Sequence, residues 1–253
     1  MVSNLELLRV QAEDSFDEAA RLRGLYGITI ACSGESQSLW VGADVPAALA
    51  SELISVFDGA AAPSNNPAEP PPALELCRRV LETGGRSLRC KAGPNYLFPD
   101  STHFRSEARI ERSGAVISAA LRGANPGNWH PVEWNELLDG RLGPWTMATE
   151  GEVVASICHT PRAFTAYRAE CGVWTHPPFR GRGYGAAVTS AWAATMRSAG
   201  RCLFYSTDAE NLSSQRLAGR LGLRPLGWTW RLMIQMDHEE SRIHPLSSVR
   251  QRQ

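Results

Sequence analysis

The sequence predicts an α+β fold in which a mixed, mostly antiparallel sheet is flanked by helices. Residues 145–149, 153–160 and 167–175 are rich in strand-forming residues and are separated by turns, as in an antiparallel meander. A glycine run at 180–185 then precedes residues 186–198, where apolar residues recur near the 3.6-residue period of a helix.

The elements after the glycine run complete this second half of the chain. A strand is expected at 201–207, and a helix at 211–221 ends before Gly222, which suits the position just after a helix. Residues 226–236 supply one or two last strands. Upstream, residues 128–138 suit a short helix with Pro131 in its first turn.

The first half of the chain predicts a separate α/β region. The expected elements are a helix within 1–24, strands at 27–32 and 38–42, a helix from Pro46 to 57, an exposed loop at 59–72, a helix at 73–82, and strands at 87–90 and 96–98. The expected domains are therefore 1–103, the second half at 104–237, and a polar tail at 238–253.

Composition excludes several classes of protein. With 26 basic and 26 acidic residues the net charge is zero, so we expect neither nucleic acid nor a membrane surface as partner. The six cysteines lack the short spacings of a metal site, and no metal is expected. No apolar segment is long enough to span a membrane, and the N-terminus lacks the features of a signal peptide, which predicts a cytoplasmic protein.

The glycine run has the chemistry of an anion site. It reads Arg180, Gly181, Arg182, Gly183, Tyr184 and Gly185, followed by Ala186 at the start of the predicted helix. Glycines let a ligand approach the backbone, and the amides and dipole of a helix N-terminus favour a phosphate or diphosphate. Six such residues alone are also compatible with a flexible turn that carries incidental arginines.

The flanking residues resemble motif A of the GNAT superfamily of acetyl-CoA-dependent N-acetyltransferases. Residues 169–177 (AECGVWTHP) precede Arg180-x-x-Gly183-x-Gly185, and residues 211–217 (NLSSQRL) with 220–223 (RLGL) resemble motif B. The resemblance covers about 145–236. It implies a GNAT-like fold and transfer of the acetyl group of acetyl-CoA, as co-substrate, to a primary amine by direct attack in a ternary complex.

A dinucleotide-binding site is the main alternative for the glycines. Gly181, Gly183 and Ala186 fit G-x-G-x-x-A, and Asp208 follows a later strand. However, Pro177 and Pro178 separate the strand from the glycines, and too little chain remains after Asp208 for a doubly wound sheet. The resemblance to acetyltransferases is therefore the better interpretation.

The resemblance implies roles for the cofactor-binding residues. The pantetheine arm would pair with Val173, Trp174 and Thr175, and the Val173 amide would polarise the thioester carbonyl. The amides of residues 180–186 would bind the diphosphate. Asn211 and Ser214 would contact the pantetheine from the other side, although asparagine is also a common N-cap residue.

The candidate catalytic groups lie on the predicted strands around the glycine run. Glu170 is the first candidate for the base because it lies just upstream on the same strand, and its alternative is a solvent-facing carboxylate. His159, whose type titrates near neutrality, is the second candidate. Many family members carry a proton-donating tyrosine where this chain has Ala218, so Tyr205 or Tyr184 would have to replace it.

The acceptor is expected to be a small amine that binds near Trp129, His130, Glu133 and Trp134. Each of these residues also has a structural interpretation, in the core or in the first turn of a helix. A homodimer is left open. A non-catalytic CoA-binding module is the alternative function, because of Ala218 and because the first half lacks a phosphate-binding motif. One interpretation of that half is a degenerate second GNAT-like region, as tandem members carry.

Overall fold

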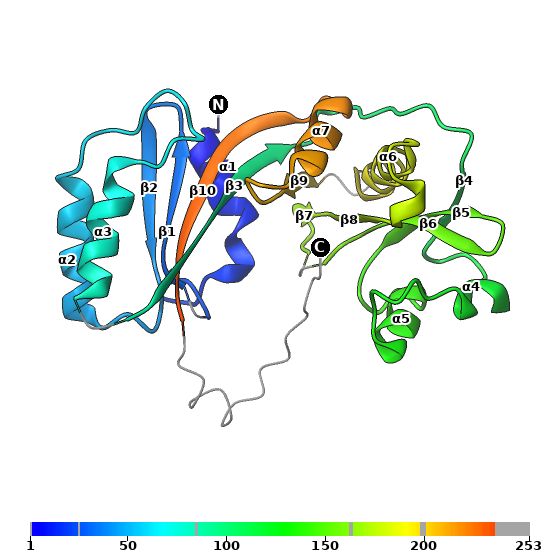
Figure 1. Cartoon of the computed structure of the whole chain (residues 1–253), viewed down its shortest axis with the longest axis horizontal. Helices are drawn as coiled ribbons and strands as arrows, with labels where there is room; N and C mark the ends of the chain where they lie inside the picture. The colour runs from blue at the N-terminus through cyan, green and yellow to red at the C-terminus, as the bar shows by residue number, and fades with distance from the viewer. Residues whose placement is uncertain (1, 25, 84–85, 162–163, 198–200, 236–253) are drawn as a thin grey trace. The chain divides into compact units, whose positions relative to one another are not determined.

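The computed structural model describes residues 2–24, 26–83, 86–161, 164–197 and 201–235 (Figure 1). The predicted tail at 238–253 lies outside these residues. Among the described residues the chain forms two compact units. The first comprises residues up to 95 together with 206–212 and 225–235, and the second comprises 96–205 and 213–224. The division into domains predicted from the sequence stays a prediction, because compactness in space does not by itself define a domain.

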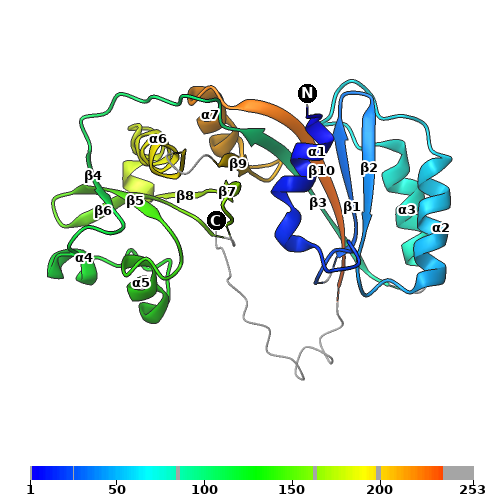
Figure 2. The same ribbon diagram turned by 180° about the vertical axis from the view of Figure 1, so that it is seen from behind.

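The first unit is a sheet with helices on both faces. Its strands follow the order β2-β1-β10-β3, and β1 pairs antiparallel with both of its neighbours. Helices α2 and α3 cover one face and α1 the other (Figure 2). The elements are α1 (Asn4–Gln11), a 3₁₀ turn (Glu13–Ser15), β1 (Tyr26–Ser33), β2 (Ser36–Val41), α2 (Ala47–Asp58), α3 (Pro72–Glu82), β3 (Leu88–Leu97) and β10 (Arg224–Ile234).

Burial explains why β1 is the central strand of this unit. Six consecutive residues of β1 are buried, a pattern expected of a strand that is covered on both faces. Ile28 and Ile30 pack into a core with Leu53, Leu81 and Leu232. The α1 helix is fixed by a capping box, in which Ser3 and Glu6 bond reciprocally to each other's backbone amides.

The second unit contains an antiparallel sheet, ordered β4-β5-β6-β8, and a parallel pair, β7 with β9. Helix α6 covers one face of the sheet, and α4 and α5 lie on the other (Figure 1). The elements are β4 (Arg109–Arg112), α4 (Ala119–Gly123), α5 (Pro131–Leu138), β5 (Trp145–Glu150), β6 (Val153–His159), β7 (Arg168–Glu170), β8 (Gly172–Thr175), a 3₁₀ turn (Pro177–Phe179), α6 (Tyr184–Arg197), β9 (Cys202–Ser206) and α7 (Leu212–Arg220).

Two apolar clusters hold this sheet from its two faces. On the α6 side, Val188 and Trp192 pack with Leu203, and Phe98, which follows β3, joins them. On the α5 side, Trp134 and Leu137 are buried against strands β5 and β6. The α+β class with a mixed, mostly antiparallel sheet is confirmed. The antiparallel β4-β5-β6-β8 sheet also excludes the doubly wound parallel sheet of a dinucleotide-binding fold.

Several element predictions were wrong in their bounds. The helix expected within 1–24 ends at Gln11, where a 3₁₀ turn follows, and the strands expected at 87–90 and 96–98 are one strand, β3. Strand β4 and helix α4 were missed, because each is only four or five residues long and carries little periodicity. The third run of the meander splits at Cys171 into β7 and β8.

Gly93 in β3 tests the packing of the first unit. A Cβ atom at this position would lie 1.9 Å from the carbonyl oxygen of Thr207, a backbone atom that cannot rotate away. We expect Gly93→Ala to lower the free energy of unfolding by at least about 2 kcal/mol, because the main chain would have to move. Urea titration of both proteins measures this difference.

Gly219, in the exposed last turn of α7, is the matched control. A Cβ atom there would meet nothing within 4 Å. Gly219→Ala should therefore raise the free energy of unfolding by about 0.5–1 kcal/mol, since alanine restricts the unfolded chain more than glycine does. Equal stability of the two variants would contradict the contact at Gly93.

Candidate functional site

The candidate site begins where the chain changes its partner strand at Cys171. Residues 168–170 pair in parallel with β9, whereas residues 172–175 pair antiparallel with β6. The amide of Cys171 is the last to bond to the β9 side, donating to the carbonyl of Phe204 at 3.1 Å. Beyond this point β7 and β8 belong to different sheets.

The register shows which main-chain groups are left on the open edge of β8. His176 donates to the carbonyl of Ala155, so the opposed pairs that exchange hydrogen bonds with β6 are those of Trp174 and Gly172. The N–H groups of Val173 and Thr175 therefore point the other way. Among the described residues no strand pairs with that edge.

The loop of residues 180–186, called the amide loop below, supplies a second set of open donors. Gly181 and Gly183 have φ of +78° and +88°, a conformation that favours glycine. The first hydrogen bond of α6 runs from the Ala187 amide to the Gly183 carbonyl. Within the described part of the chain, no acceptor is found for the amides of residues 181–186.

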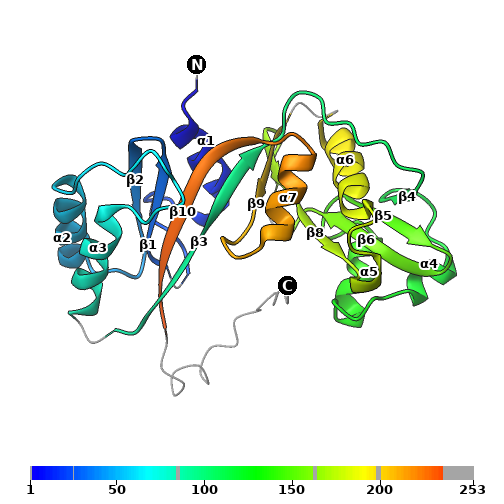
Figure 3. The same cartoon turned by 45° about the horizontal axis from the view of Figure 1, so that its top comes forward.

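The amide loop adjoins the open edge of β8 directly. A Cβ atom on Gly185 would lie 3.1 Å from Oγ1 of Thr175 and 3.8 Å from a Val173 methyl group. The same point is 4.0 Å from Leu217 of α7, and Figure 3 shows α6 and α7 next to one another. One ligand can therefore contact both the amide loop and the β8 edge.

The two arginines of the amide loop are both held by protein groups. Nε of Arg180 donates to the Thr175 carbonyl at 3.2 Å. Arg182 pairs with Glu150 at 2.7 Å, and this guanidinium lowers the pKa of the Glu150 carboxyl. Arg182 thus fixes the loop to the β5–β6 hairpin. It is not aimed at an anion in this conformation.

Asn211 and Ser214 belong to the start of α7. Asn211 immediately precedes the first residue of this helix, which is the N-cap position, and it falls in the first compact unit. Ser214 falls in the second unit, where its side chain is hydrogen-bonded to Tyr205. Their predicted contacts with a cofactor stay predictions.

Glu170 is buried at the end of β7, with 5% of its surface exposed. Its alternative interpretation as a solvent-facing carboxylate is therefore wrong. The sequence-based expectation that Glu170 shares a strand face with Gly172 and Trp174 was wrong, because β7 ends at Glu170 and β8 belongs to a different sheet. The Glu170 side chain lies at the end of β7, three residues before Val173 of β8.

His159 lies across Gly172 on the neighbouring strand. A Cβ atom on Gly172 would be 3.4 Å from Nε2 of His159, so the glycine makes room for the ring. Burial lowers the pKa of His159 from 6.5 to about 4 because no charged partner compensates the lost hydration. The imidazole is neutral at pH 7, and it is a weak base.

Tyr205 is buried in the core of the second unit. Burial raises the pKa of its hydroxyl well above the usual value, while the hydrogen bond to Ser214 acts in the opposite direction. A hydroxyl with a raised pKa releases its proton less readily than a thiol does. Ala218, at the position where a tyrosine was expected, is fully buried and offers no proton.

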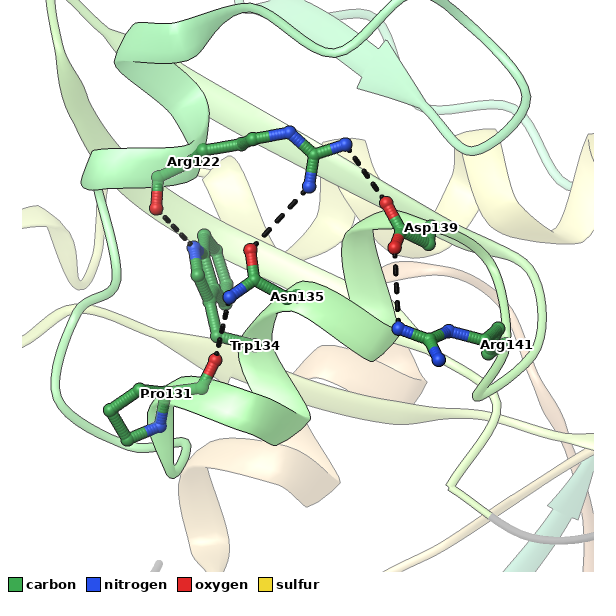
Figure 4. Close-up of polar contacts among 6 residues, drawn as sticks. All are labelled: Arg122, Pro131, Trp134, Asn135, Asp139 and Arg141. Carbon is green, nitrogen blue, oxygen red and sulfur yellow. Dashed lines mark hydrogen bonds and ion pairs between the residues drawn. The ribbon is translucent and has the colours of Figure 1, made fainter.

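The predicted acceptor residues have different surroundings. Trp134 is 1% exposed, and its indole N–H donates to the Arg122 carbonyl, which makes it a core residue (Figure 4). Glu133 accepts from the His130 amide in a capping box. Trp129 is partly exposed, and its ring contacts the rings of Trp134, His159 and Trp174 at centroid distances of 5.7–6.0 Å. Of the three, Trp129 alone combines exposure with proximity to β8.

Across the described ranges, no helix has the length and apolar character needed to cross a membrane. Nor do these residues bring three His, Cys, Asp or Glu side chains together in a metal-binding arrangement.

Comparison with known proteins gives one family and many similar folds. The acetyltransferase (GNAT) family model matches residues 117–223. No curated protein matches the chain significantly. A GNAT-family acetyltransferase from Colwellia psychrerythraea is 13% identical, with a TM-score of 0.49, over 92% of this chain and 96% of its own.

Two further structures illustrate the range of these similarities. A GNAT-family protein from Novosphingobium aromaticivorans DSM 12444 is 21% identical, with a TM-score of 0.46, over 60% of this chain and 69% of its own. The yncA protein from Salmonella typhimurium, solved with its cofactor acetyl-CoA, is 18% identical, with a TM-score of 0.36, over 55% of this chain and 99% of its own.

The lowered pKa of His159 predicts a specific pH dependence of stability. Because the folded-state pKa of about 4 lies below the unfolded value of 6.5, the unfolded chain binds the proton first as the pH falls. Stability is lost progressively from about pH 6.5 to pH 4. At pH 5 this group should cost about 2 kcal/mol relative to pH 7.5.

The measurement is the free energy of unfolding at pH 7.5 and pH 5, for the wild type and for His159→Gln. The variant should lose about 2 kcal/mol less than the wild type over this range, since glutamine does not titrate. The comparison between the two pH values cancels any constant cost of the substitution. Equal losses in both proteins would show that His159 is hydrated normally.

Proposed function

Because the acetyltransferase (GNAT) family model matches residues 117–223, we propose that this protein transfers the acetyl group of acetyl-CoA to a primary amine of a small molecule. The observation that carries the proposal is the pair of open main-chain edges. The outer edge of β8 and the amides of residues 181–186 adjoin one another and lack partners within the described chain.

These edges fit the two ends of acetyl-CoA. The amide loop at the start of α6 offers several N–H groups and the positive end of the helix dipole, which together suit a diphosphate. The β8 edge offers two N–H groups, of which that of Thr175 can donate to a carbonyl of the pantetheine arm, as in the pairing of an added strand. The Val173 amide would then face the thioester carbonyl.

In the proposed reaction the amine nitrogen attacks the carbonyl carbon, and the carbon–sulfur bond breaks. The Val173 N–H stabilises the negative charge that develops on the carbonyl oxygen. Glu170 accepts the proton of the amine, directly or through one water molecule, because it is the buried carboxylate at the end of β7, three residues before Val173. His159 is a weaker choice, since its lowered pKa makes it a poor proton acceptor.

The thiolate leaves without a proton donor from the protein. Ala218 has no acidic group, and the raised pKa of Tyr205 disfavours its ionisation. A thiolate is an acceptable leaving group at neutral pH because a free thiol has a pKa near 8.5. Tyr205 is therefore assigned to packing and to its hydrogen bond with Ser214.

For the acceptor, partly exposed aromatic rings on the α5 side of β8 support a small amine. Trp174 lies on β8, and Trp129 packs against it. Glu133 and Trp134 have structural roles in α5, so Trp129 carries the proposed contact.

A non-catalytic CoA-binding module is the second candidate function. The absence of an acidic side chain at Ala218 favours it, because a module that only binds CoA needs no such group. The two candidates differ in whether an amine triggers release of free thiol.

The assay is acetyl transfer from acetyl-CoA to a panel of amines, followed by release of free thiol. We expect amine-dependent release that falls by about 10²- to 10⁴-fold in Glu170→Gln, which keeps the shape and removes the base. Binding of CoA without release for any amine would favour the non-catalytic module. Release that is unchanged in Glu170→Gln would remove Glu170 from the mechanism.

Gly183→Glu tests the amide loop independently of turnover. A carboxylate at this position would occupy the space proposed for phosphate oxygens, so we expect at least a hundredfold loss of CoA affinity by calorimetry. Gly114→Glu is the matched control, because Gly114 has φ +86° and open space around it. If both variants bind CoA equally well, the diphosphate does not lie on this loop.

A further inference from the structure

We infer that Arg220, on α7, contacts the diphosphate of CoA and sets the affinity for it, together with Phe104, which positions the guanidinium. This inference rests on the proposed function. The sequence analysis gave Arg220 no role beyond its place in the stretch at 220–223 that resembles motif B, forty residues beyond the start of the amide loop. The structure brings it to the middle of that loop.

Gly183 locates the guanidinium of Arg220. A Cβ atom built on Gly183 would lie 3.8 Å from Nη2 of Arg220 and 3.4 Å from the edge of the Phe104 ring. Gly183 is the last residue before α6, where the open amides converge. A phosphate bound to these amides is therefore within reach of Arg220 from the opposite helix.

Phe104 restricts the conformation of Arg220. The guanidinium carbon lies 4.7 Å from the centre of the Phe104 ring, a cation–π arrangement. The ring is itself fixed, because the Phe104 amide donates to Ser190 of α6, and Ser190 donates to the Thr102 carbonyl. Part of the entropy of ordering a long side chain is thus lost on folding and need not be lost on binding.

No carboxylate among the described residues pairs with Arg220. None of the ion pairs found among the described residues involves Arg220, whereas Arg182 is paired with Glu150 and Arg180 bonds through Nε to Thr175. Arg220 is also an exposed residue of the last turn of α7. Arg220 is the one of the three arginines around Gly183 for which no hydrogen bond or ion pair is found among the described residues, so its planar donor group can bind a phosphate bidentately.

The position of the contact predicts which phosphate is bound. Gly183 belongs to the loop proposed for the diphosphate, so Arg220 should contact the diphosphate and not the 3′-phosphate of the nucleotide. Dephospho-CoA, which lacks the 3′-phosphate, should then depend on Arg220 as strongly as CoA does.

The experiment is calorimetric titration of CoA and of dephospho-CoA into the full chain, for the wild type, Arg220→Gln, Arg220→Lys and Arg141→Gln. The last is the matched control, an exposed arginine of the same unit that pairs with Glu136 and Asp139. We expect Arg220→Gln to weaken binding of both ligands about 10- to 100-fold, with a smaller loss in Arg220→Lys. In the acetyl-transfer assay, KM for acetyl-CoA should rise while kcat is retained.

Three results would overturn the inference. Affinity in Arg220→Gln that matches Arg141→Gln would show that Arg220 does not contact the ligand. A loss that is seen with CoA and absent with dephospho-CoA would place Arg220 at the 3′-phosphate. A wild type that binds no CoA would refute the proposed function as well. The wild-type titration therefore tests the proposed CoA site, and the variants test the role of Arg220. Thermal melts of each variant establish that the fold is retained.

Discussion

The change of partner strand at Cys171 is the constraint on which the candidate site depends. Main-chain N–H groups inside a protein need acceptors, and a continuous strand would find them on both sides. Here the Cys171 amide donates to a carbonyl of β9. Two residues later the Val173 amide points to the same side of the chain, but β8 has joined a different sheet and no strand is paired there among the described residues. The fold thus keeps an ordered row of donors for a ligand, held in place by β6 on the other side.

The amide loop depends on a similar division of roles. Glycines at positive φ turn the backbone so that successive amides face outward, and α6 adds its dipole. Both arginine side chains of the loop contact protein groups. Arg182 forms an ion pair with Glu150 of the β5–β6 hairpin, and Arg180 donates a hydrogen bond to the Thr175 carbonyl at the end of β8. Two other buried groups of this unit, His159 and Tyr205, remain uncharged at neutral pH, because burial lowers the pKa of His159 and raises that of Tyr205.

The sheet of the first compact unit contains a strand from the other end of the described chain. The family match ends at residue 223, and β10 begins at Arg224. That strand does not close the second unit, since it pairs with β1 and carries Leu232 into the core of the first. The sheet and the core of the first unit therefore need residues from the end of the described chain, so this unit is not formed by a continuous N-terminal segment.

The sequence by itself determined the α+β class, the helix after the glycine run and the resemblance to the acetyltransferase (GNAT) family, whose model matches residues 117–223, because these depend on local periodicity and on residue types at fixed spacing. It also predicted Glu170 as a base and residues 180–186 as an anion-binding loop, and these roles stay predictions. Four features depend on strand pairing and burial, and only the tertiary structure decided them. They are the split of residues 167–175 into two strands, the core role of Trp134, the weak basicity of His159, and the approach of Arg220 to Gly183. Each of these joins residues distant in sequence, and local patterns do not encode such contacts.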